Sequence, residues 1–413
     1  MSDAMSDTEQ IAADFDLERL PGDFYDDPFP IYAALQKHQP LKRMPNGSYF
    51  VTRYADCQAI YKDPRTFSSD KKIEFKPKFG DSPLYDHHTT SLVFNDAPLH
   101  TRVRKLIMAA LTSRVVASME AGLKTLVDGL LDGMEAKARR GTAVDIIEDF
   151  ASAIPIEIIG NLLGVPAEAR GPLRGWSLAI LGALEPRLAP EQLDAGNRAV
   201  AEFLAYLEVL VADRRKNPGD PATDVLTRLI FEEVAGEKLQ HHELLQNCIF
   251  ILNAGHETTT NLIGNGIATL ALHDAERARL LADDTLIASA IEEILRFESP
   301  NQIGNRRVVS PTAIGGVEMP VGTLITTCIA AANRDAQEFP NPERFDVGRT
   351  PNRHLAFASG VHQCAGLNIA RLEGRVAISA FLKRFPGYSL DGKPQRSQRA
   401  RFRGFVSMPV RLN

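Results

Sequence analysis

The residue with the clearest chemical potential is Cys364, near the end of the segment Phe357-Ala-Ser-Gly-Val-His-Gln-Cys-Ala-Gly366. The small residues let the backbone pass close to a flat cofactor, and a helix starting just after Cys364 would stabilise a thiolate through its free amides and its dipole. A thiolate held in this way can bind haem iron; the alternative is a buried structural cysteine. The pattern of Phe, Gly, Cys and Gly at these spacings is expected by chance in roughly one such chain in a thousand, which favours a ligand.

A second group of reactive side chains lies in the run Ala254-Gly-His-Glu-Thr-Thr259, in the middle of a predicted long helix. Glycine followed closely by two β-branched threonines is poor helix chemistry and predicts a local distortion. A threonine hydroxyl can also bond a carbonyl of the preceding turn and open a groove. Glu257 and Thr258 could therefore pass protons, although a threonine within a helix is more often structural.

Two further patterns carry charge. His100 and Arg104 are four residues apart, so a helix presents both to a single target; a solvated helix face is the alternative. Glu293-Ile-Leu-Arg296 places an acid and a base three residues apart, a pattern that about one segment in a chain of this length shows by chance. Its position upstream of Pro342-Glu-Arg344-Phe345 makes it informative.

With these motifs in this order, the chain resembles the cytochrome P450 family over most of its length. The resemblance implies a haem-thiolate enzyme whose cofactor is haem b and whose iron ligand is Cys364. It assigns the haem environment to a set of matching positions: His100, Arg104, Arg306, Phe357, Gly360, His362, Cys364 and Gly366. Arg307 competes with Arg306 for one of these roles, and the spacing to the glycine pair 315–316 favours Arg306. Ala358 departs from the pattern, since the family has Gly or Ser there.

The resemblance also gives roles to the acidic motifs. Glu257 and Thr258 become an acid–alcohol pair that delivers protons beside a groove for O₂, although many family members carry Asp at the position of Glu257. Glu293, Arg296 and Arg344 become a buried ion-pair network that braces the haem loop. Such charges tolerate burial only when all of them are paired, so we expect this network to be structural.

The predicted substrate pocket lies above the haem. Phe250, Ala254 and Thr258 recur every four residues and share one helix face. Other pocket positions follow from the resemblance: Val93, Asn253, Ile303, Gly304, Phe405 and Val406. The expected substrate is a small apolar molecule. It could carry a carboxylate, because lysines crowd a nearby loop at positions 71, 72, 76 and 78; exposed lysines with no role in substrate binding are the other interpretation.

The predicted reaction inserts one oxygen atom of O₂ into the substrate, with electrons from NAD(P)H. No G-x-G-x-x-G segment follows a predicted strand, so a separate ferredoxin and ferredoxin reductase are expected to supply the electrons. Two alternatives remain open. A haem-thiolate enzyme that uses peroxide would not need the acid–alcohol pair, and a haem sensor or carrier would not need the O₂ groove.

Composition narrows the class of protein. Apolar residues make up 44% and charged residues 24% of the 413 positions, which is typical of globular proteins. A net charge of −5 gives no support for nucleic-acid binding. No apolar stretch approaches the roughly 18–20 residues that span a bilayer, and the acidic N-terminal segment does not resemble a signal peptide. The four cysteines form no Cys-x-x-Cys pair. We expect a cytoplasmic monomer with no nucleic-acid or membrane partner.

The surrounding elements are predicted to form one catalytic domain over residues 1–413, mainly α with a minor β part and a flexible tail at 1–20. A helix over 243–272 is apolar almost all round, so it should be buried and should cross above the haem. Helical periodicity predicts the other helices over 30–38, 100–111, 114–139, 168–184, 191–216, 287–299 and 365–385. Short strands are predicted at 49–52 and within 308–325.

Overall fold

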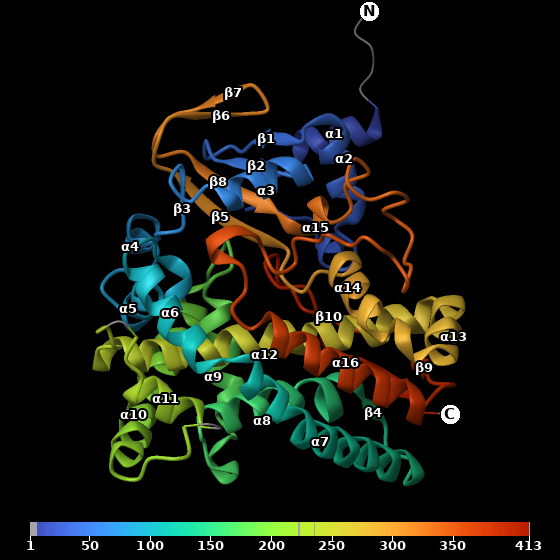
Figure 1. Ribbon diagram of the computed structural model, residues 1–413. Helices are drawn as coiled ribbons and strands as arrows, with labels where there is room; N and C mark the ends of the chain where they lie inside the picture. The colour runs from blue at the N-terminus through green and yellow to red at the C-terminus, as the bar shows by residue number, and fades with distance from the viewer. Residues whose placement is uncertain (1–5, 222–223, 235, 413) are drawn as a thin grey trace, which may run out of the picture.

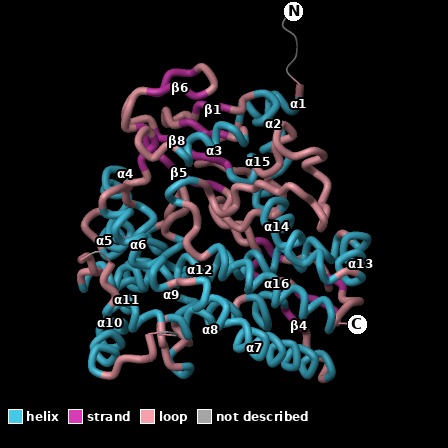
Figure 2. The backbone as a smooth tube through the Cα atoms, viewed as in Figure 1, coloured by secondary structure: helices cyan, strands magenta, loops and turns pink. Residues whose placement is uncertain are grey.

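The structure is a computed structural model that describes residues 6–221, 224–234 and 236–412. Helices fill most of the molecule, and a smaller sheet region combines N-terminal segments with segments from the last third of the chain (Figures 1 and 2). The prediction of a mainly α fold with a minor β part is confirmed.

The helices begin and end close to the predicted positions. They are α1 (Asp7–Asp14), α2 (Phe29–His38), α3 (Tyr54–Lys62), α4 (Lys72–Phe79), α5 (Pro83–Thr90), α6 (Leu99–Ala110), α7 (Ser113–Arg139), α8 (Ala153–Leu162), α9 (Leu173–Gly182), α10 (Pro190–Lys216), α11 (Val225–Phe231), α12 (His241–Leu272), α13 (Asp274–Ala282), α14 (Ile287–Phe297), α15 (Ile329–Ala332) and α16 (Leu367–Arg384). The largest difference is at 168–184, where α9 starts only after Pro172 and a separate 3-10 turn precedes it. Proline is favoured at a helix start and disfavoured within a helix.

The strands form one five-stranded sheet and several small ones. The strands are β1 (Leu41–Arg43), β2 (Tyr49–Val51), β3 (Phe67–Ser68), β4 (Val144–Asp145), β5 (Ile303–Val308), β6 (Thr312–Ile314), β7 (Val317–Met319), β8 (Leu324–Cys328), β9 (Ser389–Leu390), β10 (Gln395–Arg396), β11 (Phe405–Ser407) and β12 (Pro409–Arg411). The main sheet has the order β1-β2-β8-β5-β3. Only the β2–β8 pair in it is parallel. This sheet brings residues near position 50 beside residues near position 325.

Helix α12 runs through the middle of the molecule, with α16 beside it (Figure 1). It also packs against α8, α9, α10 and α14, and most of its side chains are buried. Gly266 allows the closest packing, because an added Cβ would lie 2.6 Å from Ile378 in α16 and 3.0 Å from Ile294 in α14. The buried apolar surface of the surrounding helices thus fixes the position of α12 relative to the loop before α16.

The prediction of a flexible tail over residues 1–20 is wrong for its described part, and residues 1–5 lie outside the described residues. Residues Asp7–Asp14 form α1, with Ser6 as the N-cap. Ala12 and Phe15 are buried, and the Phe15 ring lies 4.9 Å from that of Phe50 in β2. The apolar side chains of this acidic segment anchor it against the sheet.

Across the described residues, no single helix combines the length and apolar character needed to cross a membrane, whereas α6 and α7 satisfy that test only when taken together across a 50° bend.

Candidate active site

The cysteine-bearing loop, residues 357–366, passes close to α3. Gly360 has a φ of +71°, and an added Cβ would lie 2.4 Å from the carbonyl oxygen of Tyr61. Only glycine fits this approach. Ala358 also has a left-handed φ, +55°, a conformation that costs a residue with a Cβ roughly 1–2 kcal/mol. The departure from the family pattern at Ala358 therefore places alanine where glycine would be unstrained.

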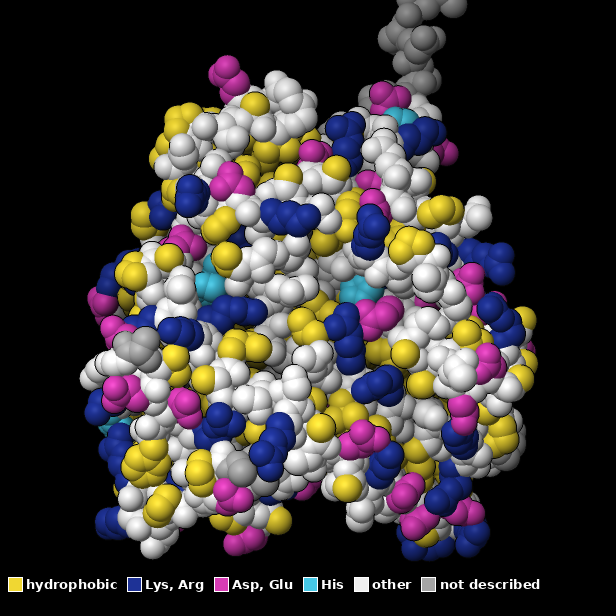
Figure 3. All heavy atoms as spheres, in the orientation of Figure 1, with side chains coloured by type: hydrophobic (Ala, Val, Ile, Leu, Met, Phe, Trp, Pro, Cys, Tyr) yellow, Lys and Arg dark blue, Asp and Glu magenta, His cyan; other side chains and the backbone are white. Residues whose placement is uncertain are grey.

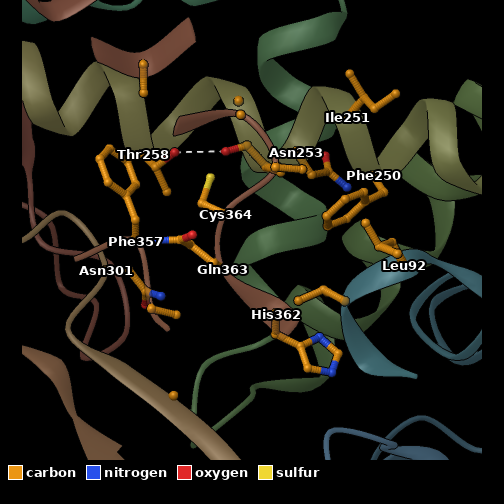
Figure 4. Close-up of a pocket in the computed structure, with 18 of the residues that line it drawn as sticks. Leu92, Phe250, Ile251, Asn253, Thr258, Asn301, Phe357, His362, Gln363 and Cys364 are labelled. Atoms are coloured by element: carbon orange, nitrogen blue, oxygen red, sulfur yellow. Dashed lines mark hydrogen bonds between the residues drawn. The ribbon is translucent and has the colours of Figure 1, made fainter. Parts of the chain in front are cut away.

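Cys364 points out of this loop toward α12 (Figure 4). Its amide N–H donates to the Phe357 carbonyl at 2.9 Å, which closes the loop. The thiol opens on a cavity between the loop and α12. Burial raises the pKa of Cys364, and the Gly366 N–H opposes the rise by donating to the sulfur. A metal cation bound to this sulfur would reverse the shift, because a coordinating thiol is deprotonated.

The opposite wall of the cavity is the face of α12 that the four-residue spacing predicted. Phe250, Ala254 and Thr258 all line the cavity. The Thr258 hydroxyl donates to the Ala254 carbonyl at 2.8 Å, drawn as the dashed line in Figure 4. The predicted distortion does not interrupt the helix, which is continuous from His241 to Leu272. The side-chain bond to the preceding turn is present.

Glu257 lies beside Thr258 in the sequence but is bound to a residue that sequence reasoning missed. Its carboxylate is 5% exposed, and the Arg399 guanidinium donates to both of its oxygens at 2.7 and 2.6 Å. Burial raises the pKa of Glu257 to about 7, against the opposing effect of Arg399. A carboxyl with this pKa exchanges protons near neutral pH, as a general acid or base must.

Basic side chains gather at one end of the cavity, where the sequence predicted partners for the haem propionates. His100, Arg104, Arg306 and His362 all line it. Within the described residues, the Nε2 atoms of His100 and His362 are buried without a hydrogen-bond partner, and their rings stack at 3.9 Å. Buried polar atoms are normally paired. These unpaired nitrogens and the cationic guanidiniums fit the carboxylates of haem b, with the Cys364 sulfur placed to meet its iron.

The buried ion-pair network differs from the predicted one in one member. Arg296 and Glu293 are both fully buried, with Nε 2.7 Å from Oε2. Arg349, not Arg344, supplies the second guanidinium, at 3.0 Å from the same carboxylate. Arg344 contributes only its carbonyl oxygen, which accepts from Arg296 and Arg349. The prediction for Arg344 is wrong, because its side chain is exposed.

The pocket prediction is right about some residues and wrong about others. Residues that line the cavity as predicted are Val93, Phe250, Asn253, Ala254 and Gly304. Ile303 lies outside it, in the core against the sheet, because neighbouring residues of a strand face opposite sides. Phe405 is buried in the helical core under the Arg396 guanidinium, and Val406 is 51% exposed. Their place in the lining is taken by Arg401 and Phe402.

Sequence reasoning also missed Glu373, a cavity-lining carboxyl in α16. It is 2% exposed. Burial raises the pKa of Glu373 to about 8, and a hydrogen bond from Thr259 lowers it. Its position two turns into a helix with no obvious motif gave no signal, although an acid on the buried face of an amphipathic helix is unusual.

Comparison with known proteins gives a consistent result. A family model described as Cytochrome P450 matches residues 184–412. The chain is 37% identical over 404 residues to cytochrome P450 monooxygenase PikC of Streptomyces venezuelae, covering 96% of this chain and 94% of the relative. It is 33% identical to polyketide biosynthesis cytochrome P450 PksS of Bacillus subtilis (strain 168), covering 95% and 97%. The crystal structure of P450BioI in complex with hexadec-9Z-enoic acid ligated acyl carrier protein superposes with a TM-score of 0.88 at 31% identity, covering 95% and 100%.

Proposed function

The chain belongs to the cytochrome P450 family and is an oxidoreductase that uses haem b with a cysteine thiolate ligand, and from that premise we propose that Cys364 is the iron ligand of a monooxygenase acting on an apolar small molecule. Haem b, when bound through a thiolate, supplies the activation of O₂. The observation that carries the proposal is a single cavity with Cys364 on one wall and Thr258 on the other (Figure 4).

The residues of α12 are proposed to control protons at this site. The Thr258 hydroxyl faces the cavity and accepts or donates hydrogen bonds there, while Glu257 supplies a proton from a position closed to bulk solvent. Arg399 holds the Glu257 carboxylate in place through two short hydrogen bonds. This arrangement needs a movement of Glu257 or an intervening water to reach Thr258, because the Glu257 carboxylate points to Arg399.

The substrate is proposed to be small and largely apolar. Aliphatic and aromatic side chains dominate the part of the cavity between α12 and the short helical turn at 92–94, with Leu92, Val93, Phe250 and Ile251 among them. Asn253 adds a polar group, and its Oδ1 has no hydrogen-bond partner among the described residues. The named complex of P450BioI carries an acyl chain on a carrier protein; a carrier-bound substrate is a second form in which this pocket could receive an apolar chain.

Electrons are proposed to come from NAD(P)H through a ferredoxin and its reductase, with the enzyme acting as a cytoplasmic monomer. Basic side chains are scattered across the middle of the face in Figure 3, which lies over α6 and the loop before α16 in Figure 1. Lys105, Arg114 and Arg353 are exposed, so they are available to an acidic partner. Charge complementarity of this kind raises association rates.

The proposed function is tested by following the origin of the inserted oxygen. Compounds are first screened for a substrate-induced change in the haem absorption spectrum. The best binder is then incubated with NADPH, a ferredoxin and a ferredoxin reductase under ¹⁸O₂. We expect product that carries one ¹⁸O atom. Product that forms only with added hydrogen peroxide would instead support the peroxide-using alternative.

A further inference from the structure

One cavity-lining cation has no role in holding haem or protons. Arg401 lies between β10 and β11 and reaches the cavity beside Asn305 of β5. Its Nη1 donates to the Ile303 carbonyl at 3.1 Å, and its Nη2 donates to the Asn305 side-chain oxygen. Two backbone-anchored contacts therefore fix the guanidinium at the cavity wall.

The guanidinium of Arg401 is not neutralised. Across the described residues, no carboxylate oxygen is recorded within ion-pair distance of it, and its Nε is buried without a hydrogen-bond partner. Glu185 is the nearest acid along this segment, but it accepts from the backbone N–H groups of Ala400 and Arg401. Burying a charge without a partner is costly, so the site is incomplete without a ligand that accepts hydrogen bonds.

Lysines of the α4 region add positive charge to the same end of the cavity. Lys71 is 4% exposed and lies 3.4 Å from Glu74. The same carboxylate is shared with Arg307, at 3.5 Å. Burial lowers the pKa of Lys71 to about 8 against the effect of Glu74, and the nearby Arg401 charge lowers it further.

Lys78 is held on the other side of Arg401. Its Nζ donates to the backbone carbonyl of Glu185 at 2.6 Å instead of to a carboxylate. Burial lowers the pKa of Lys78 to about 8, and Arg401 is the next cause. The described cations at this end of the cavity therefore outnumber the carboxylates: Lys71, Lys78, Arg307 and Arg401 against Glu74 and Glu185. Lys72 and Lys76 take no part, since they are exposed and paired with Asp70 and Asp81.

We propose that Arg401 binds the carboxylate of an acidic substrate, with Lys71 and Lys78 supplying supporting positive charge, so that the substrate class is an apolar chain ending in a free acid. The inference rests on the proposed function and specifies which end of the substrate faces away from Cys364. A guanidinium matches a carboxylate in shape and number of donors. The apolar lining between Arg401 and Thr258 accommodates the hydrocarbon part.

The proposal is tested with a matched ligand set and the haem-loaded enzyme. Dodecanoic acid, methyl dodecanoate and dodecan-1-ol have the same chain and differ at the end group. Each is titrated against wild type, Arg401→Gln and Arg401→Lys at pH 7.5, and Kd is measured from the absorption change and by calorimetry. Lys72→Gln, in an exposed ion pair of the same region, is the control. Methyl dodecanoate binding reports whether each variant keeps an intact pocket.

We expect wild type to bind the acid about 10- to 100-fold more tightly than the ester, since a hydrogen bond to a charged group contributes about 1.5–3 kcal/mol. Arg401→Gln should reduce this ratio to within about threefold while leaving ester binding unchanged. Arg401→Lys should keep part of the preference, and Lys72→Gln all of it. Equal binding of acid and ester by wild type, or a preference retained in Arg401→Gln, would overturn the inference. If Arg401→Gln does not fold, the wild-type ratio and its partial retention in Arg401→Lys still decide the matter. The proposed function fails separately, if the wild-type protein gives no thiolate signature with carbon monoxide.

Discussion

The buried carboxyl of Glu373 predicts a specific dependence of stability on pH. Its pKa is raised by burial from 4.5 to about 8 in the folded protein. Between these two values the folded protein holds a proton that the unfolded chain has lost. The free energy of unfolding therefore falls as pH rises from about 4.5 to 8 and then levels off. At 1.36 kcal/mol per pKa unit, the loss between pH 5 and pH 8 is about 3–4 kcal/mol.

Glu373→Gln removes this loss, because an amide does not ionise. The Thr259 hydroxyl can still donate to the new side chain, and the unpaired amide N–H adds a penalty that is the same at every pH. For a chain of 413 residues, 3–4 kcal/mol corresponds to about 4 °C in Tm. The Tm of Glu373→Gln, measured by differential scanning fluorimetry relative to wild type, should thus rise by about 4 °C between pH 5 and pH 8. Glu168→Gln, at an exposed position, is the control. A difference in Tm that stays constant over this range refutes the reasoning.

Three further predictions concern the active site and its support. Thr258→Ala should retain haem and substrate binding but release much of the consumed NADPH as hydrogen peroxide, measured as product and peroxide formed per NADPH; full coupling would exclude the proton role of Thr258. Glu257→Gln should slow turnover about 10²–10⁴-fold, and because the raised pKa of Glu257 is about 7, wild-type turnover should fall as pH rises above that value; a flat pH profile would contradict this. Arg349→Met should cost about 3–5 kcal/mol in urea denaturation by leaving the buried Glu293 with one guanidinium fewer, whereas Arg344→Met should have little effect; equal losses would argue against the observed pairing.

Local patterns predicted the parts of the site that one element builds alone. Phe250, Ala254 and Thr258 lie on one side of α12 because helical periodicity sets which residues share a face. The loop around Cys364 was also predictable, since small residues and a following helix restrict what the backbone can do there. Gly304 and Ile303 show that the same logic applies to strands, because alternation places only one of the pair in the cavity.

The parts that depend on distant contacts were not predictable from local patterns. Arg349 replaces Arg344 in the ion-pair network because the chain between 340 and 349 folds back on itself, with Arg349 donating to the carbonyls of Pro340 and Arg344. Arg399 reaches Glu257 across 142 positions, and Arg401 reaches Asn305 across 96. A single sequence carries no pattern for such pairs, since basic residues at the end of the chain are usually solvated.

The central claim, that Cys364 binds haem iron as a thiolate, is tested most directly by the carbon monoxide difference spectrum of the reduced protein. Wild type should give the long-wavelength band typical of thiolate ligation. Cys364→His should lose that band while retaining haem, and Cys57→Ala, which removes a buried cysteine outside the cavity, should keep it. A long-wavelength band that persists in Cys364→His would contradict the account.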